Sequence, residues 1–84
     1  MLTLHYFARL REKLSMEREE IDLPSHIKSI ADLMGWLGER GPEWEEELNL
    51  YGRVRCAVNQ KIANPETRVQ DGDEVAFFPP VTGG

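Results

Sequence analysis

A single amphipathic helix in the first half of the chain most limits the folds available to it. Its apolar residues fall at positions i, i+3, i+4 and i+7 of one helical face: Ile30, Leu33, Met34 and Leu37. Ser29 followed by Asp32 is typical of a capping box at the start, and Gly41-Pro42 provides an end signal. A chain of 84 residues can build one core, so we expect the remaining segments to form one sheet against this helix.

The most apolar strands are predicted at the two ends of the chain. Residues 2–8 alternate between two faces, with Leu2, Leu4 and Tyr6 on one and Thr3, His5 and Phe7 on the other. Residues 74–78 follow the turn signal Asp71-Gly72-Asp73, and their apolar density predicts a buried central strand. Pro79 and Pro80 end that strand, because proline cannot continue a ladder.

Shorter elements are predicted between these strands. They are a loop at 9–15, an edge strand at 17–23, a second short helix at 42–50, a strand at 54–58, a turn at 59–61 and a return strand at Ile62. This order fits the α+β class, with a mixed sheet packed on one main helix, which is the ubiquitin-like β-grasp architecture. We expect one domain over residues 1–80 and a flexible tail over 81–84.

Composition excludes several classes of function. The net charge of −5 argues against nucleic acid, whose phosphates require clustered Lys and Arg. A lone cysteine excludes an internal disulfide, and no stretch approaches the length of a membrane span, so we expect a cytoplasmic protein with no membrane partner. His5 and His26 lack further ligands at a suitable spacing, so no metal site is predicted.

No catalytic constellation stands out, so the chain is not expected to be an enzyme by itself. Cys56 lies between Val54 and Val58 in a predicted strand, which predicts a buried thiol with a raised pKa rather than a nucleophile. The tail Pro79-Pro80-Val81-Thr82-Gly83-Gly84 joins a stiff base to a thin tip. Such a tip suits entry into a narrow channel, although composition alone favours a frayed terminus.

Three segments resemble the small-subunit family of molybdopterin synthase. Residues 71–84, DGDEVAFFPPVTGG, are similar to the C-terminal signature of that family without interruption. Residues 7–12, FARLRE, resemble its first-strand motif, and residues 57–60, AVNQ, resemble its third-strand motif. The resemblance therefore spans the chain, while residues 17–52 match in pattern and length alone.

The resemblance implies a sulfur carrier whose working group is the carboxylate of Gly84, preceded by Gly83. A ubiquitin-activating-type adenylyltransferase would use ATP to adenylate Gly84, after which sulfur would replace an oxygen to give a thiocarboxylate. No cofactor is expected to be bound permanently. Residues 79–82 would enter the large subunit, in a complex of two small and two large subunits, and sulfur would pass to cyclic pyranopterin monophosphate to build the dithiolene of molybdopterin.

The resemblance also gives meaning to the outer face of the predicted sheet. Strand alternation places Phe7 and Phe78 on the face opposite Tyr6 and Phe77, away from the helix. We predict that Phe7, Ile62 and Phe78 contact the large subunit, with a minor second core as the other reading. Arg11 and Glu12 match the family motif, and contact with the activating enzyme and a plain turn are equally good accounts of them.

Two other functions stay open at this point. A related carrier for thiamine synthesis or transfer-RNA thiolation resembles this fold and ends in Gly-Gly, although Phe77-Phe78-Pro79-Pro80 favours the molybdopterin branch. A protein-interaction module with an inert tail is the reading from another class, because a fold does not determine a function.

Overall fold

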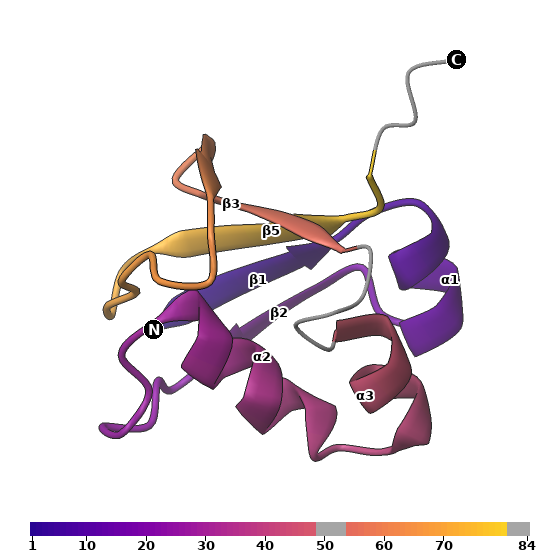
Figure 1. Cartoon of the computed structure of the whole chain (residues 1–84), viewed down its shortest axis with the longest axis horizontal. Coiled ribbons are helices and arrows are strands. Elements are labelled where there is room, and N and C mark those ends of the chain that lie inside the picture. Colours follow the sequence, from indigo (N-terminus) through magenta and orange to yellow (C-terminus); the bar gives the residue numbers. More distant parts are fainter. Residues whose placement is uncertain (49–53, 81–84) are drawn as a thin grey trace.

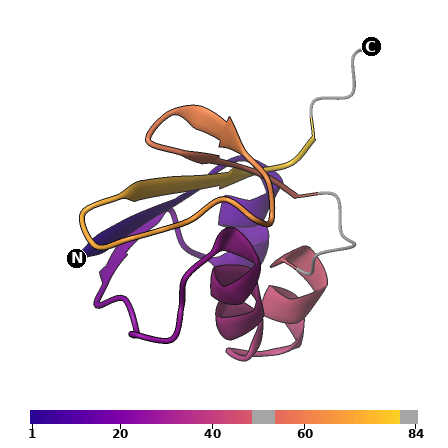
Figure 2. The same cartoon turned by 60° about the vertical axis from the view of Figure 1, so that its left-hand side comes forward.

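The computed structural model describes residues 1–48 and 54–80, which form one five-stranded mixed sheet with helices on one side (Figure 1). The strands are β1 (Leu2–Tyr6), β2 (Arg18–Ile21), β3 (Arg55–Val58), β4 (Lys61–Ala63) and β5 (Glu74–Phe78). The helices are α1 (Arg9–Leu14), α2 (Ile30–Gly38) and α3 (Pro42–Leu48). The turned view in Figure 2 shows the helices below the sheet and, in the part of the chain that the structure describes, no helix on the opposite face.

The sheet has the order β2-β1-β5-β3-β4, so β5 is the central strand, as the sequence predicts. It runs parallel to β1 and antiparallel to β3, which makes the sheet mixed. β2 lies at one edge, again as predicted, and β4 lies at the other. A two-residue turn, Asn59-Gln60, joins β3 to β4, with positive φ angles of 50° and 69° that suit a tight hairpin.

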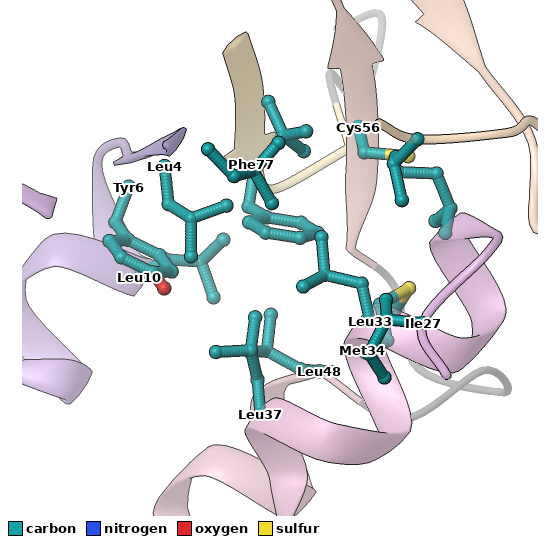
Figure 3. Close-up of a cluster of buried hydrophobic side chains, with 14 of the residues drawn as sticks. Leu4, Tyr6, Leu10, Ile27, Leu33, Met34, Leu37, Leu48, Cys56 and Phe77 are labelled. Carbon is teal, nitrogen blue, oxygen red and sulfur yellow. The ribbon is translucent and has the colours of Figure 1, made fainter. Parts of the chain in front are cut away.

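The core lies between the inner face of the sheet and α2. β1 and β5 supply Leu2, Leu4, Tyr6, Val75 and Phe77, each with no exposed surface. Figure 3 shows the Phe77 ring directed at leucines of α2 and α3, with Tyr6 beside it. Burying a Val, Leu or Phe side chain contributes about 1.5–3 kcal/mol, so these two strands supply a large part of the driving force for folding.

Helix α2 begins and packs as predicted. The Ser29 hydroxyl accepts a hydrogen bond from the Asp32 backbone N–H at 3.2 Å, and the Asp32 carboxylate accepts one from the Ser29 N–H at 3.3 Å. This reciprocal capping satisfies donors that the first helical turn leaves free. The predicted apolar stripe is the buried face of the helix. The second predicted helix also forms, as α3, although the last two residues of its predicted range, 49–50, lie outside the described residues.

The prediction of a loop at residues 9–15 is wrong, because Arg9–Leu14 form helix α1. Leu10 and Leu14 lie four residues apart on one face of this helix, and both are buried. The helix has no side-chain cap at its start, and six residues are too short for a stable isolated helix. Tertiary packing of the two leucines therefore stabilises this helix, and local sequence signals do not predict it.

A polar cluster ties β1 and β2 to the helical layer. The Tyr6 hydroxyl donates to Glu19 Oε2 at 2.8 Å, and Arg40 binds the same carboxylate through Nη1 at 2.7 Å and Nη2 at 2.9 Å. The Arg40 guanidinium lies 4.6 Å from the centre of the Trp44 ring. Burial, followed by the hydrogen bond to Glu19, raises the pKa of Tyr6. The cluster thus satisfies a polar atom in the core, which would otherwise be costly to bury.

None of the helices among the described residues is long and apolar enough to cross a membrane. Two regions remain to be considered for function: the carboxyl end of β5 and the outer face of the sheet, which no helix among the described residues covers.

Candidate functional site: the outer face and the end of the central strand

The central strand leads directly to the segment predicted to carry the chemistry. Val75 and Phe77 are completely buried, and β5 is hydrogen-bonded to strands on both sides. It ends at Phe78, and Pro79 and Pro80 follow as half-buried residues outside the ladder. The predicted tail residues Val81, Thr82, Gly83 and Gly84 lie outside the described residues. The residues before the tail are therefore held by the central strand of the sheet.

The outer face carries the three residues predicted to contact a partner. Phe7 is 50 % exposed and Ile62 is 79 % exposed. Exposed apolar side chains that share one face of a sheet indicate an interaction surface, whereas single ones do not. Phe78 is half-buried, whereas its neighbour Phe77 is completely buried. The predicted alternation between the two faces is thus confirmed, while the contact with a partner stays a prediction.

Strand register shows how these residues are arranged. The Phe7 N–H donates to the Phe77 carbonyl at 3.0 Å, which continues the β1–β5 ladder and sets Phe7 beside Phe78. Ile62 faces Ala57 in β3, and Ala57 faces Ala76 in β5. Ile62 is therefore two strands from β5, about 10 Å at the usual strand spacing. We define the outer apolar strip as this set: Phe7, Ile62 and Phe78, with Ala57 and Ala76 between them.

A strained turn holds Phe7 in place. Ala8 has φ 53° and ψ −126°, and the Leu10 N–H donates to the Phe7 carbonyl at 3.1 Å. These values correspond to the first central position of a type II′ turn, which normally requires glycine. An L-residue in this region costs energy, and such strain persists where the surroundings impose it. The sequence gives no sign of this turn, because alanine is not a turn residue.

Charged residues lie around the apolar strip. His5 Nε2 is 3.1 Å from Glu74 Oε2, and the His5 ring stacks on Phe7 with centres 6.1 Å apart. Arg55 opposes Phe78 across the β3–β5 ladder and is exposed. The sequence analysis did not identify Arg55 as a site residue. Arg55 directly precedes Cys56 in the predicted strand, so its side chain points to the face opposite that of Cys56, which is the outer face. Arg11, matched by motif, lies in α1 with Nη1 3.6 Å from Glu17 Oε1.

Cys56 is buried, as predicted, and lies on the inner face with 6 % exposure. Burial raises the pKa of its thiol, which lowers the fraction of thiolate near neutral pH. Its Sγ lies 3.8 Å from the Ala63 carbonyl oxygen. Within residues 1–48 and 54–80, no three His, Cys, Asp or Glu side chains gather into a group that could hold a metal ion. The chemistry of a reactive thiol therefore finds no support at Cys56.

A shallow hollow of about 410 Å³ lies at the other end of the sheet. It is bounded by the segment after β2 and the segment before β5, with residues such as Leu23, Lys28, Arg68 and Asp71 at its rim. Asp71 is already bound to the N-terminal amine at 2.7 Å. The hollow is open and lies at the start of β5, whereas the predicted tail follows its end, so it is remote from the apolar strip.

Comparison with known proteins gives the same assignment as the sequence motifs. The ThiS family model matches residues 4–84. The molybdopterin synthase sulfur carrier subunit of Haemophilus influenzae is 36% identical over 84 residues, covering 100% of both chains. The crystal structure of SAMP1 from Haloferax volcanii has a TM-score of 0.76 and 26% identity, covering 99% of this chain and 98% of that one.

A further solved structure shares the fold at lower identity. It is the complex of subunits 1 and 2 of molybdopterin-converting factor from Helicobacter pylori, with a TM-score of 0.65 and 23% identity over 99% of this chain and 97% of that one. The β-grasp architecture and the resemblance drawn from residues 7–12, 57–60 and 71–84 are thus confirmed. The chain belongs to the ThiS family and, within it, to the molybdopterin synthase sulfur carrier subunits.

Proposed function

We propose that this chain carries sulfur as a thiocarboxylate on Gly84 and donates it to cyclic pyranopterin monophosphate within molybdopterin synthase. Full-length similarity to a curated sulfur carrier subunit is the observation that carries the proposal. The carrier needs no catalytic pocket of its own, because it presents a reactive group to enzymes that supply the site. This division agrees with a chain whose one thiol, Cys56, is buried.

The chemistry requires activation before sulfur can enter. A carboxylate is a poor electrophile until one oxygen becomes part of a good leaving group, and adenylation by an ATP-using activating enzyme provides this. Sulfide-level sulfur (HS⁻) then attacks the acyl carbon, a C–S bond forms, the C–O bond to AMP breaks and AMP leaves. The product is a thiocarboxylate that stays anionic and nucleophilic at neutral pH. ATP is thus a substrate of the activating enzyme, and sulfur is cargo of the carrier.

The rigid segment before the tail, β5 followed by Pro79 and Pro80, supports a model in which the tail is delivered into a partner. Four residues beyond Pro80 span at most about 14 Å when extended, so Gly84 reaches a buried site only if the partner closes over the base of the tail. The outer apolar strip begins at this base, with Phe78 directly before Pro79. We propose that the large subunit covers this strip, in an assembly of two small and two large subunits. Alanine replacement of Phe78 is then expected to weaken the complex.

The experiment that tests the carrier function is an intact-mass measurement. The chain is incubated with its activating enzyme, ATP and a sulfur source, beside a variant that lacks Gly84 and a Cys56→Ser variant. We expect exchange of one oxygen for sulfur in the full chain and in Cys56→Ser, and no exchange without Gly84. Sulfur found on Cys56 as a persulfide would contradict the proposal, because the carrier atom would then be in the fold and not in the tail.

The acceptor is tested separately from the loading step. Loaded chain is mixed with the large subunit and cyclic pyranopterin monophosphate, and molybdopterin is measured. A carrier for thiamine synthesis or transfer-RNA thiolation, the second candidate, would load with sulfur but form no molybdopterin. An interaction module with an inert tail would fail at loading, with the activating enzyme shown to be competent on another carrier.

A further inference from the structure

Arg55 is an exposed cation at the edge of the outer apolar strip. It is the first residue of β3 and lies directly across the ladder from Phe78. Among the described residues, no carboxylate lies within ion-pair distance of its guanidinium. The charged residues at the other outward positions of these strands have polar partners: Glu74 Oε2 lies 3.1 Å from His5 Nε2, and Arg18 Nη2 lies 2.7 Å from Glu20 Oε1. Among the described outward-facing residues of these strands, Arg55 is therefore the cation that has no carboxylate partner.

A partner that covers Phe78 must also deal with Arg55. Residues opposed on neighbouring strands have Cβ atoms about 5 Å apart, so a surface that removes water from Phe78 removes it from Arg55 as well. A guanidinium that loses water without gaining an acceptor is strongly unfavourable. The acceptor that best matches its planar fork is a carboxylate, which accepts two parallel hydrogen bonds.

Resting on the proposed function, we infer that Arg55 pairs with a carboxylate of the large subunit and thereby fixes the orientation of the docked complex. The strip supplies area without a preferred direction, since apolar contact is not directional. A bidentate Arg55–carboxylate pair beside Phe78 supplies that direction, close to the residues that lead into the tail. The partner surface is thus an apolar depression with an acidic residue at the edge that faces β3.

The overall charge of the chain predicts the opposite effect for the loss of a cation, so a variant of Arg55 can distinguish a short-range pair from long-range attraction. A net charge of −5 favours basic partner surfaces in general. Loss of any one cation would therefore strengthen long-range attraction to a basic partner. Loss of Arg55 should weaken binding, because a short-range pair is removed.

Affinity and dissociation rate of the complex with the large subunit provide the test. The variant is Arg55→Gln, and the matched control is Arg68→Gln. Arg68 is also exposed, has no ion pair among the described residues, and lies at the remote hollow. We expect Arg55→Gln to weaken binding about 10-fold, mainly through faster dissociation, and Arg55→Lys to retain part of the affinity. Arg68→Gln should stay within about twofold.

The outcomes separate this inference from the function on which it rests. If the full chain binds and Phe78→Ala weakens binding while Arg55→Gln behaves as Arg68→Gln, the Arg55 pair is refuted and the docking face stands. An effect of Arg55→Gln confined to the association rate would also refute it, because that is the signature of steering at an exposed rim. If the full chain does not bind the large subunit, the proposed function fails and the inference fails with it.

Discussion

The turn at Ala8 allows a prediction in which the same substitution has opposite effects at two positions. Ala8 has φ 53°, where an L-residue is strained. The strain costs about 1–3 kcal/mol, and glycine would remove it. Glycine also loosens the unfolded chain, which offsets about 0.4–1 kcal/mol of that gain. We therefore expect Ala8→Gly to raise the free energy of unfolding by about 0.5–2 kcal/mol.

Ala31 provides the matched control. It lies in α2 with helical backbone angles, so glycine there relieves nothing and lowers helix propensity. Ala31→Gly should lower the free energy of unfolding by about 1 kcal/mol. Urea titrations of both variants, with the slope held common, measure the two values. The midpoint of thermal unfolding should rise by a few degrees for Ala8→Gly, at about 4–8 °C per kcal/mol for a domain of this size.

Equal destabilisation by the two glycines would refute the reasoning. It would mean that the backbone at Ala8 is relaxed, and that the turn is held by favourable contacts instead of being imposed by its surroundings. A gain at Ala8 larger than about 3 kcal/mol would exceed what one strained residue stores and would indicate an additional change in the packing of α1.

Three further predictions follow from the core and the strand alternation. Glu19→Ala leaves the buried Tyr6 hydroxyl without its acceptor, and we expect a loss of about 2–3 kcal/mol in urea unfolding; full stability would show that water replaces the carboxylate. Burial raises the pKa of Cys56 above 9.0 and that of Tyr6 above 10.0, so the folded form keeps protons that the unfolded form releases. The contribution of these two groups to stability should therefore be constant up to about pH 9 and fall above it, with the first part of that fall absent in Cys56→Ser. Phe77→Ala should cost about 3–5 kcal/mol of stability, whereas Phe78→Ala should leave most of the stability and weaken the complex by about 1 kcal/mol or more; equal stability loss would place Phe78 in a core.

Much of the fold could be predicted because strand alternation and helical stripes are local patterns. Each predicted strand is present, and the main helix is capped by the side chain of Ser29, as its local sequence predicts. Helix α1 could not be predicted in the same way, since its two buried leucines matter only once α3 and β5 lie against them. The bond from Tyr6 to Glu19 joins residues 13 positions apart, and pairing of this kind depends on register, which no single segment contains.

Prediction of the candidate site divides along the same line. The proposal of Gly84 as the carrier residue came from a motif, because a terminal glycine pair has no physical signature that separates it from an ordinary chain end. The outward direction of Phe7 and Phe78 came from alternation alone. Strand alternation also indicates that Arg55 faces outward, but its place opposite Phe78 requires the β3–β5 register. The strained turn at Ala8 requires a backbone angle that the sequence does not reveal. Motifs thus gave the chemistry, and geometry gave the surface that positions it.

The two faces of β5 link stability to function through register. A slip of one residue would exchange the faces, placing Phe78 in the core and Phe77 on the outer face. Burial of Phe77 against the helical layer therefore determines that Phe78 points outward and that Pro79 leaves the sheet at the edge of the apolar strip. Substitutions that weaken the core around Phe77 should also disturb the arrangement of the outer apolar strip, because β5 positions both Phe77 and Phe78. Substitutions on the outer face should change partner affinity with little effect on the core, since that face contributes little buried area.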